Sequence, residues 1–116
     1  MTISLRGQSA IVGKGYYGLG KSPNTSPMEL IAKATQNALA DAGMQLSDID
    51  GICGGTFYHF FPTLSIAVYL GIQPTWANSD MVGGSSFMSY LVEASMAIQA
   101  GLCKNVLICY GSNAKS

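Results

Sequence analysis

A short run of glycine and serine, residues 83–86, is the part of the sequence whose composition best suits chemistry. It precedes a segment that is apolar over most of its length, carries Glu93 as its one formal charge and ends at Gly101. Such a segment is typical of a helix that is covered on every side. The start of a helix offers unpaired N–H groups and the positive end of the helix dipole. We therefore expect a developing negative charge to be held at this position.

The two serines of this run also have an ordinary structural explanation. Ser85 and Ser86 lie where the helix would begin, and serine is a favoured capping residue. Ser85 is not the nucleophile of a G-x-S-x-G elbow, because Phe87 occupies the position of the second glycine. Helix capping alone would account for both serines.

Two overlapping glycine patterns near the N-terminus are similar to phosphate-binding loops. Residues 13–18 fit G-x-G-x-x-G, and residues 15–22 fit the spacing of a Walker A loop. Both motifs need a helix directly after the loop, so that the helix N-terminus can hold the phosphates. Pro23 disfavours helical angles at Ser22, and the next capping signal starts only at Ser26. A glycine-rich surface loop is the favoured interpretation, and a P-loop nucleotide-binding protein is kept as a third function hypothesis.

His59 lies in an aromatic run, residues 57–61, just before an expected helix. A lone histidine among aromatic side chains is typical of packing rather than of a catalytic base. The run could nevertheless wall an apolar binding cleft or form a subunit contact, because aromatic residues are enriched at both.

Three cysteines, Cys53, Cys103 and Cys109, lie inside apolar runs. This placement favours buried free thiols in a reducing compartment over a disulfide. With no C-x-x-C motif and one histidine, the sequence predicts no metal site.

The expected elements alternate between strands and helices. Strands are predicted at 9–12, within 48–55, at 75–78 and at 106–110. Helices are predicted from the Ser26 cap and Pro27 to Gly43, from Pro62 or Thr63 to Gly71, and over 85–100. The order β-α-β-α-β-α-β predicts an α/β fold with a mixed, mostly parallel sheet and helices on both faces.

The composition limits what kind of protein this is. Of the 116 residues, 10% are charged, against roughly 25% in an ordinary soluble domain, and 48% are hydrophobic. We expect either that a partner covers much of the surface or that the chain is part of something larger. The net charge is zero and the basic residues are scattered, which disfavours nucleic acid binding. No run of about 18 apolar residues and no signal peptide is seen, so we expect no membrane span and a cytoplasmic location.

Taken together, several segments resemble the N-terminal part of a thiolase-fold protein of the lipid-transfer-protein type. They are A-I-V-G at 10–13, S-P-M-E-L at 26–30, A-L-A-D-A-G at 38–43, D-I-D-G at 48–51, Y-L-G-I at 69–72, G-G-S-S-F at 83–87 and A-I-Q-A-G-L-C at 97–103. Full thiolases are several times longer, contain two similar halves in five layers, and usually dimerise. The resemblance therefore implies that residues 1–116 are an incomplete N-terminal half-domain, which we expect to be inactive alone and prone to associate.

The resemblance also implies where the chemistry lies. In true thiolases a cysteine at the start of the central helix attacks the acyl-CoA, because the helix dipole and a base lower its pKa. The matching position here is Gly84, or Ser85 if the register shifts by one, and neither is cysteine. Gly83, Ser86 and His59 are the expected substrate-binding residues. A thiolase-like enzyme without its nucleophile could still cleave a carbon–carbon bond by a retro-aldol route.

Two function hypotheses follow from the resemblance. The first is an acyl-CoA enzyme that performs acyl transfer or carbon–carbon cleavage on fatty-acid or steroid side-chain substrates. The second is a catalytically silent subunit that binds lipid or acyl-CoA. Coenzyme A is expected as part of the substrate, with no tightly bound cofactor. A homodimer is expected in the parent protein, and some relatives also work with a separate OB-fold partner.

Overall fold

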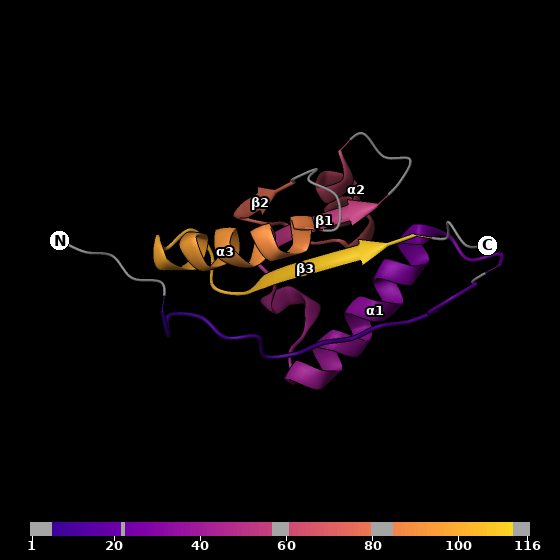
Figure 1. Cartoon of the computed structure of the whole chain (residues 1–116), viewed down its shortest axis with the longest axis horizontal. Coiled ribbons are helices and arrows are strands. Elements are labelled where there is room, and N and C mark those ends of the chain that lie inside the picture. Colours follow the sequence, from indigo (N-terminus) through magenta and orange to yellow (C-terminus); the bar gives the residue numbers. More distant parts are fainter. Residues whose placement is uncertain (1–5, 22, 57–60, 80–84, 113–116) are drawn as a thin grey trace.

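A three-stranded parallel sheet forms the centre of the chain (Figure 1). The computed structural model describes residues 6–21, 23–56, 61–79 and 85–112. The strands are β1 (Gly51–Thr56), β2 (Trp76–Asn78) and β3 (Val106–Gly111). Their order is β2-β1-β3, and the register places Gly51 opposite both Trp76 and Val106. The predicted α/β class is confirmed, and the described sheet is wholly parallel rather than mixed.

The first helix, α1 (Pro27–Ala42), begins and ends at the residues that the sequence indicates. The Ser26 side chain accepts a hydrogen bond from the backbone N–H of Glu29 at 3.1 Å, and proline occupies the first turn. At the other end, Gly43 adopts a left-handed conformation with φ of 68°. Glycine tolerates this conformation without steric cost, so it stops the helix at a defined point.

Two helices cover one face of the sheet. The second, α2 (Pro62–Leu70), ends at Gly71, which is also left-handed, with φ of 79°. Together α1, α2 and the strands bury one apolar cluster: Met28, Ile31, Ile49, Ile52, Ile66, Ala67, Ile72 and Leu107. This cluster holds α1 and α2 against β1 and β3.

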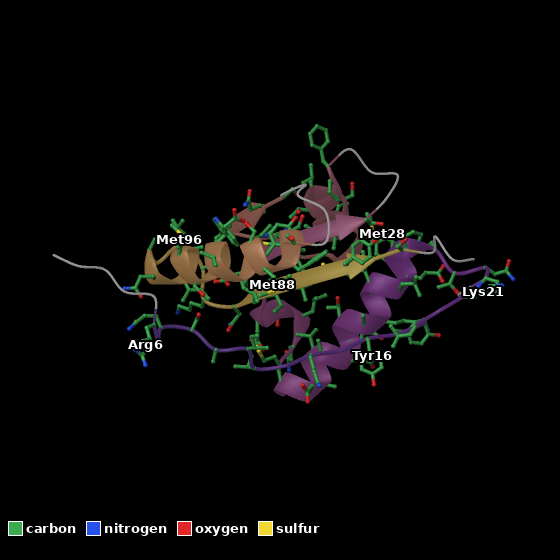
Figure 2. All side chains as sticks on the ribbon, viewed as in Figure 1. Arg6, Tyr16, Lys21, Met28, Met88 and Met96 are labelled. Atoms are coloured by element: carbon green, nitrogen blue, oxygen red, sulfur yellow. The ribbon has the colours of Figure 1, made fainter. Side chains whose placement is uncertain are left out.

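The third helix, α3 (Ser86–Gln99), covers the opposite face, so helices lie on both faces as predicted. Within this chain alone the helix is not covered on every side, so the expected full coverage stays a prediction for a larger assembly. Met88, Val92 and Met96 are 67%, 55% and 55% exposed and follow one another at every fourth residue of α3. Figure 2 labels Met88 and Met96 on this helix. The sheet can cover only one side of a helix, and the described residues place no second layer over α3.

The predicted strand at residues 9–12 was also wrong. These residues are extended but form no strand, and Ile11 and Val12 are 76% and 63% exposed. The N-terminal segment instead runs along α1 (Figure 1). A strand needs a neighbouring strand edge for its backbone hydrogen bonds, and none of the described strands pairs with residues 9–12.

The glycine patterns near the N-terminus serve this packing against α1. A Cβ atom at Gly13 would lie 2.6 Å from the carbonyl oxygen of Ala38, and one at Gly15 would collide with the same helix backbone. The backbone N–H of Lys14 donates to Asp41 at 2.9 Å, and the side-chain amide of Asn37 donates to the Tyr16 carbonyl at 3.0 Å. No helix begins directly after the described part of the loop, as a phosphate-binding motif would require. The glycines thus permit close contact with a helix backbone.

A buried hydroxyl in α1 gives a stability prediction. Thr35 is buried, and its Oγ1 has no hydrogen-bond partner among the described residues. Thr35→Val replaces the hydroxyl by a methyl group of similar shape and removes the cost of burying it. We expect the free energy of unfolding, measured by urea denaturation, to rise by about 1 kcal/mol. Thr35→Ser, which keeps the hydroxyl and loses the methyl group, should lower it. If the valine variant were less stable than the natural chain, the Thr35 hydroxyl would have a hydrogen-bond partner in solution.

Candidate active site

The candidate site lies where α3 begins, beside the carboxyl ends of the strands. In parallel sheets ligands bind at this edge, because the strand ends and the helix N-termini meet there. A Cβ atom at Gly55, near the end of β1, would lie 3.8 Å from the Phe87 ring in the first turn of α3. The ring of Phe87 in turn contacts Tyr110, near the end of β3. The sheet therefore supports the start of α3 directly.

The two serines at the start of α3 differ in their surroundings. Ser85 is exposed, and its side chain makes no capping hydrogen bond. The capping role expected for Ser85 was therefore wrong. A capping residue has an extended backbone, and its side chain accepts a hydrogen bond from an N–H group in the first turn that follows it. Ser85 instead has helical angles, with φ of −73° and ψ of −10°. Ser86 is the first residue of α3 and is buried.

Three other predicted site residues, His59, Gly83 and Gly84, lie outside the described residues. Their roles in substrate binding and catalysis stay predictions. Of the predicted set, the structure places Ser85 and Ser86 side by side at the start of α3.

An aromatic cluster not expected from the sequence packs between α3 and the sheet. The Phe87 ring contacts Tyr90 at 5.7 Å between centroids and Tyr110 at 5.5 Å, both edge to face. Tyr90 is buried, and its hydroxyl donates to the carbonyl of Gly54 at 3.3 Å. The i, i+3 spacing of Phe87 and Tyr90 was the available sequence signal, because such residues share one face of a helix.

A polar network lies at the ends of β1 and β2. The register of β2 with β1 ends at the pair Cys53 and Asn78, so Gly54 has no partner residue on β2. The Thr63 hydroxyl accepts from the Gly54 N–H at 3.1 Å and donates to the Asn78 carbonyl at 2.8 Å. The Ser79 hydroxyl also bonds to it. Thr63, at the start of α2, thus takes the place of a further residue of β2.

Glu93, the one formal charge on α3, joins this network. Its carboxylate accepts a hydrogen bond of 2.5 Å from the side-chain amide of Asn78. In the sequence, Glu93 stands out only as the one charge in an otherwise mostly apolar segment. Its partner is 15 residues away in sequence, on a strand, so no local pattern points to the pair.

None of the three cysteines lies at the start of α3. Cys53 is in β1, Cys109 is in β3, and Cys103 lies beside Gly51 at the other end of the sheet. All three are free thiols; Cys53 and Cys103 are buried, as predicted, whereas residue Cys109 is half-buried. Burial, followed by the proximity of Cys53, raises the pKa of Cys109 to about 12. Burial and then the Asp50 carboxylate raise the pKa of Cys103. Neither thiol is a ready nucleophile near neutral pH.

Within the described ranges, no three or more His, Cys, Asp or Glu side chains come together in a way that could hold a metal ion. In the same part of the chain, no helix has both the length and the apolar character needed to cross a bilayer.

The sequence is similar to two curated enzymes. It is 34% identical over 108 residues to the 17-hydroxy-3-oxo-4-pregnene-20-carboxyl-CoA lyase of Mycobacterium tuberculosis. It is 31% identical over 107 residues to the steroid side-chain-cleaving aldolase of Thermomonospora curvata. Each alignment covers 91% of this chain but 27% of the relative, so the chain spans about a quarter of these proteins. No protein-family model matches the chain.

Solved structures show the same fold. The Ltp2-ChsH2(DUF35) aldolase superposes with a TM-score of 0.86 and 27% identity, over 97% of this chain and 30% of the other. The monomeric SCP2-thiolase like protein type 1 of Mycobacterium smegmatis superposes with a TM-score of 0.66 and 31% identity. That match covers 84% of this chain and 22% of the other.

Proposed function

Because this chain belongs to the thiolase superfamily, we propose that the protein acts on acyl-CoA thioesters and cleaves a carbon–carbon bond by a retro-aldol route. One observation carries the proposal. The start of α3 holds serine, preceded in the sequence by glycine, where thiolytic acyl transfer needs a cysteine thiolate. The free cysteines lie elsewhere, and the pKa values of Cys103 and Cys109 are raised.

The proposed reaction needs no nucleophilic side chain on α3. A base outside the described residues removes the proton of the β-hydroxyl group of the substrate. The bond between the α and β carbons breaks, the hydroxyl carbon becomes a ketone, and the electron pair forms the enolate of the shortened acyl-CoA. The first N–H groups of α3 hold the enolate oxygen, with Gly83 and Gly84 leaving room for the thioester. Protonation of the α carbon then releases the acyl-CoA product.

The names of the relatives support this choice of reaction. One is a carboxyl-CoA lyase and the other a side-chain-cleaving aldolase, both of steroid type. We therefore place the substrate in the class of β-hydroxyacyl-CoA thioesters with a bulky, steroid-like tail. An OB-fold partner, a homodimer and a cytoplasmic location belong to the same proposal, and acyl transfer remains the alternative chemistry.

The deciding experiment compares two reactions. The chain is assayed alone and together with co-expressed polypeptides that complete the thiolase-like fold. One substrate is a steroid-type β-hydroxyacyl-CoA, and the other is a β-ketoacyl-CoA supplied with free CoA. We expect the completed protein to release a ketone and a shortened acyl-CoA from the first substrate without added CoA, and the chain alone to be inactive. CoA-dependent cleavage of only the second substrate would overturn the proposal.

A catalytically silent acyl-CoA or lipid-binding subunit is the second candidate. The side chains at the start of α3, Ser85, Ser86 and Phe87, include no base that works near neutral pH. Acyl-CoA binding in a calorimeter, without turnover of either substrate by the completed protein, would favour this candidate.

A cysteine placed at the proposed site tests the position itself. We expect Ser85→Cys or Gly84→Cys to create a thiol with a lowered pKa, because a helix N-terminus stabilises the thiolate. Its alkylation by iodoacetamide at pH 7 should be about tenfold faster than that of an ordinary exposed cysteine. Met96→Cys, near the far end of α3 and exposed, is the matched control. Equal rates at positions 84, 85 and 96 in folded protein would mean that the proposed site is placed at the wrong residues.

A further inference from the structure

We propose that Thr63, Asn78, Tyr90 and Glu93 form a closed circuit of hydrogen bonds that positions the start of α3 against β1 and β2. They are positioning residues and act through the backbone of α3. The inference rests on the proposed function, because it gives the start of α3 a catalytic use. The circuit itself consists of contacts among described residues and can be tested separately.

The first half of the circuit joins α3 to the end of β2 and then to β1. The Asn78 amide donates to the Glu93 carboxylate at 2.5 Å. The Asn78 carbonyl accepts from the Thr63 hydroxyl at 2.8 Å, and that hydroxyl accepts from the Gly54 N–H at 3.1 Å. A carboxylate acceptor makes the first of these bonds a strong one.

The second half returns from β1 to α3. The Gly54 carbonyl accepts from the Tyr90 hydroxyl at 3.3 Å. Tyr90 and Glu93 are three residues apart on α3, so they lie on the same face of the helix. The circuit therefore closes within one turn of α3, with one attachment to β1 and one to β2.

Two hydrogen bonds from α3 to different strands restrict rotation and sliding of the helix, which packing from one side does not restrict. The sheet covers one side of α3, while Met88, Val92 and Met96 on another side are exposed. Apolar contact is not directional, so it resists removal of the helix more than rotation or sliding along its axis. The bond to Gly54 and the bond to Asn78 together oppose both motions. They thereby set where the N–H groups at the start of α3 point.

A reciprocal exchange of side chains tests the circuit. Asn78→Asp sets two carboxylates against each other, whereas Asn78→Asp combined with Glu93→Gln restores an amide facing a carboxylate with unchanged net charge. We expect backbone amide hydrogen exchange in residues 90–93, whose N–H groups bond within α3, to become about tenfold faster in the single variant and to return to the natural rate in the double variant. Gln99→Glu adds the same charge near the far end of α3 and should leave these rates unchanged.

The same variants are then combined with Ser85→Cys to read the geometry of the site. We expect Asn78→Asp to remove most of the tenfold gain in alkylation rate at position 85, and the double exchange to restore it. An ordinary rate for Ser85→Cys alone would defeat the proposed site but leave the exchange measurement to judge the circuit. Unchanged hydrogen exchange in Asn78→Asp, or a double variant as fast as the single one, would overturn the circuit.

Discussion

Iodoacetamide at pH 8 should alkylate Cys109 in the folded protein roughly a thousand times more slowly than in the unfolded chain. Burial, followed by the proximity of Cys53, raises the pKa of Cys109 from an ordinary 9.0 to about 12. Only the thiolate reacts, so three units of pKa lower the reactive fraction by about a thousandfold at this pH. The Sγ atom also lies 3.8 Å from the Cys53 carbonyl, to which it donates. Peptide mass spectrometry after timed alkylation measures the rate at each cysteine.

Alkylation in concentrated urea is the control, because there all three cysteines should react alike. A Cys109 rate in the native protein within tenfold of the urea rate would contradict the raised pKa of Cys109.

The same pKa has a thermodynamic consequence. The folded state holds the thiol proton more tightly than the unfolded state, so this contribution to stability is complete below about pH 9 and is lost as the pH rises toward 12.

Asp50→Ala should lower the free energy of unfolding by about 2–3 kcal/mol. The carboxylate of Asp50 accepts backbone hydrogen bonds from Lys104, at 2.9 Å to each oxygen, and from Asn105 at 2.8 Å. These donors belong to the loop that enters β3, while Asp50 directly precedes β1. The side chain therefore ties together the starts of two paired strands, and its loss leaves two N–H groups without their charged acceptor. Urea denaturation followed by circular dichroism measures the change.

Asp50→Asn separates geometry from charge, because it keeps one oxygen that can accept a hydrogen bond. We expect it to lose about half as much stability as the alanine variant. If Asp50→Ala changed the free energy of unfolding by less than about 0.5 kcal/mol, water would have replaced the carboxylate, and the two strand entries would be held by other contacts.

The helix boundaries could be predicted because neighbouring residues determine them. Ser26 and Pro27 start α1, and Gly43 and Gly71 end α1 and α2 by adopting a conformation that other residues avoid. Each signal acts within one turn of helix and needs no knowledge of the tertiary structure. The three strands of the sheet were found for a similar reason, since short apolar runs between such signals favour buried strands.

The errors concern features that depend on distant parts of the chain. Residues 9–12 have strand-like composition, but composition does not supply a neighbouring edge. Ser85 has the side chain of a cap, but its backbone angles are helical. At the candidate site, the bond between Asn78 and Glu93 requires β2 and α3 to be placed first, so a linear pattern could not reveal it.

The register of β1 determines which loops are closed when the sheet forms, and therefore how much chain entropy is lost. Gly51 pairs with Trp76 on one side and Val106 on the other, so the segments closed by these pairings have very different lengths. Because closure entropy grows with the logarithm of length, roughly doubling the loop adds only about 0.6 kcal/mol to its cost. The ladder with β3 extends as far as Thr56 and Gly111, whereas the ladder with β2 stops at Cys53 and Asn78. The central strand β1 thus forms its longer ladder with β3, the partner that is further away in the sequence. The additional loss of loop-closure entropy for this pairing is small.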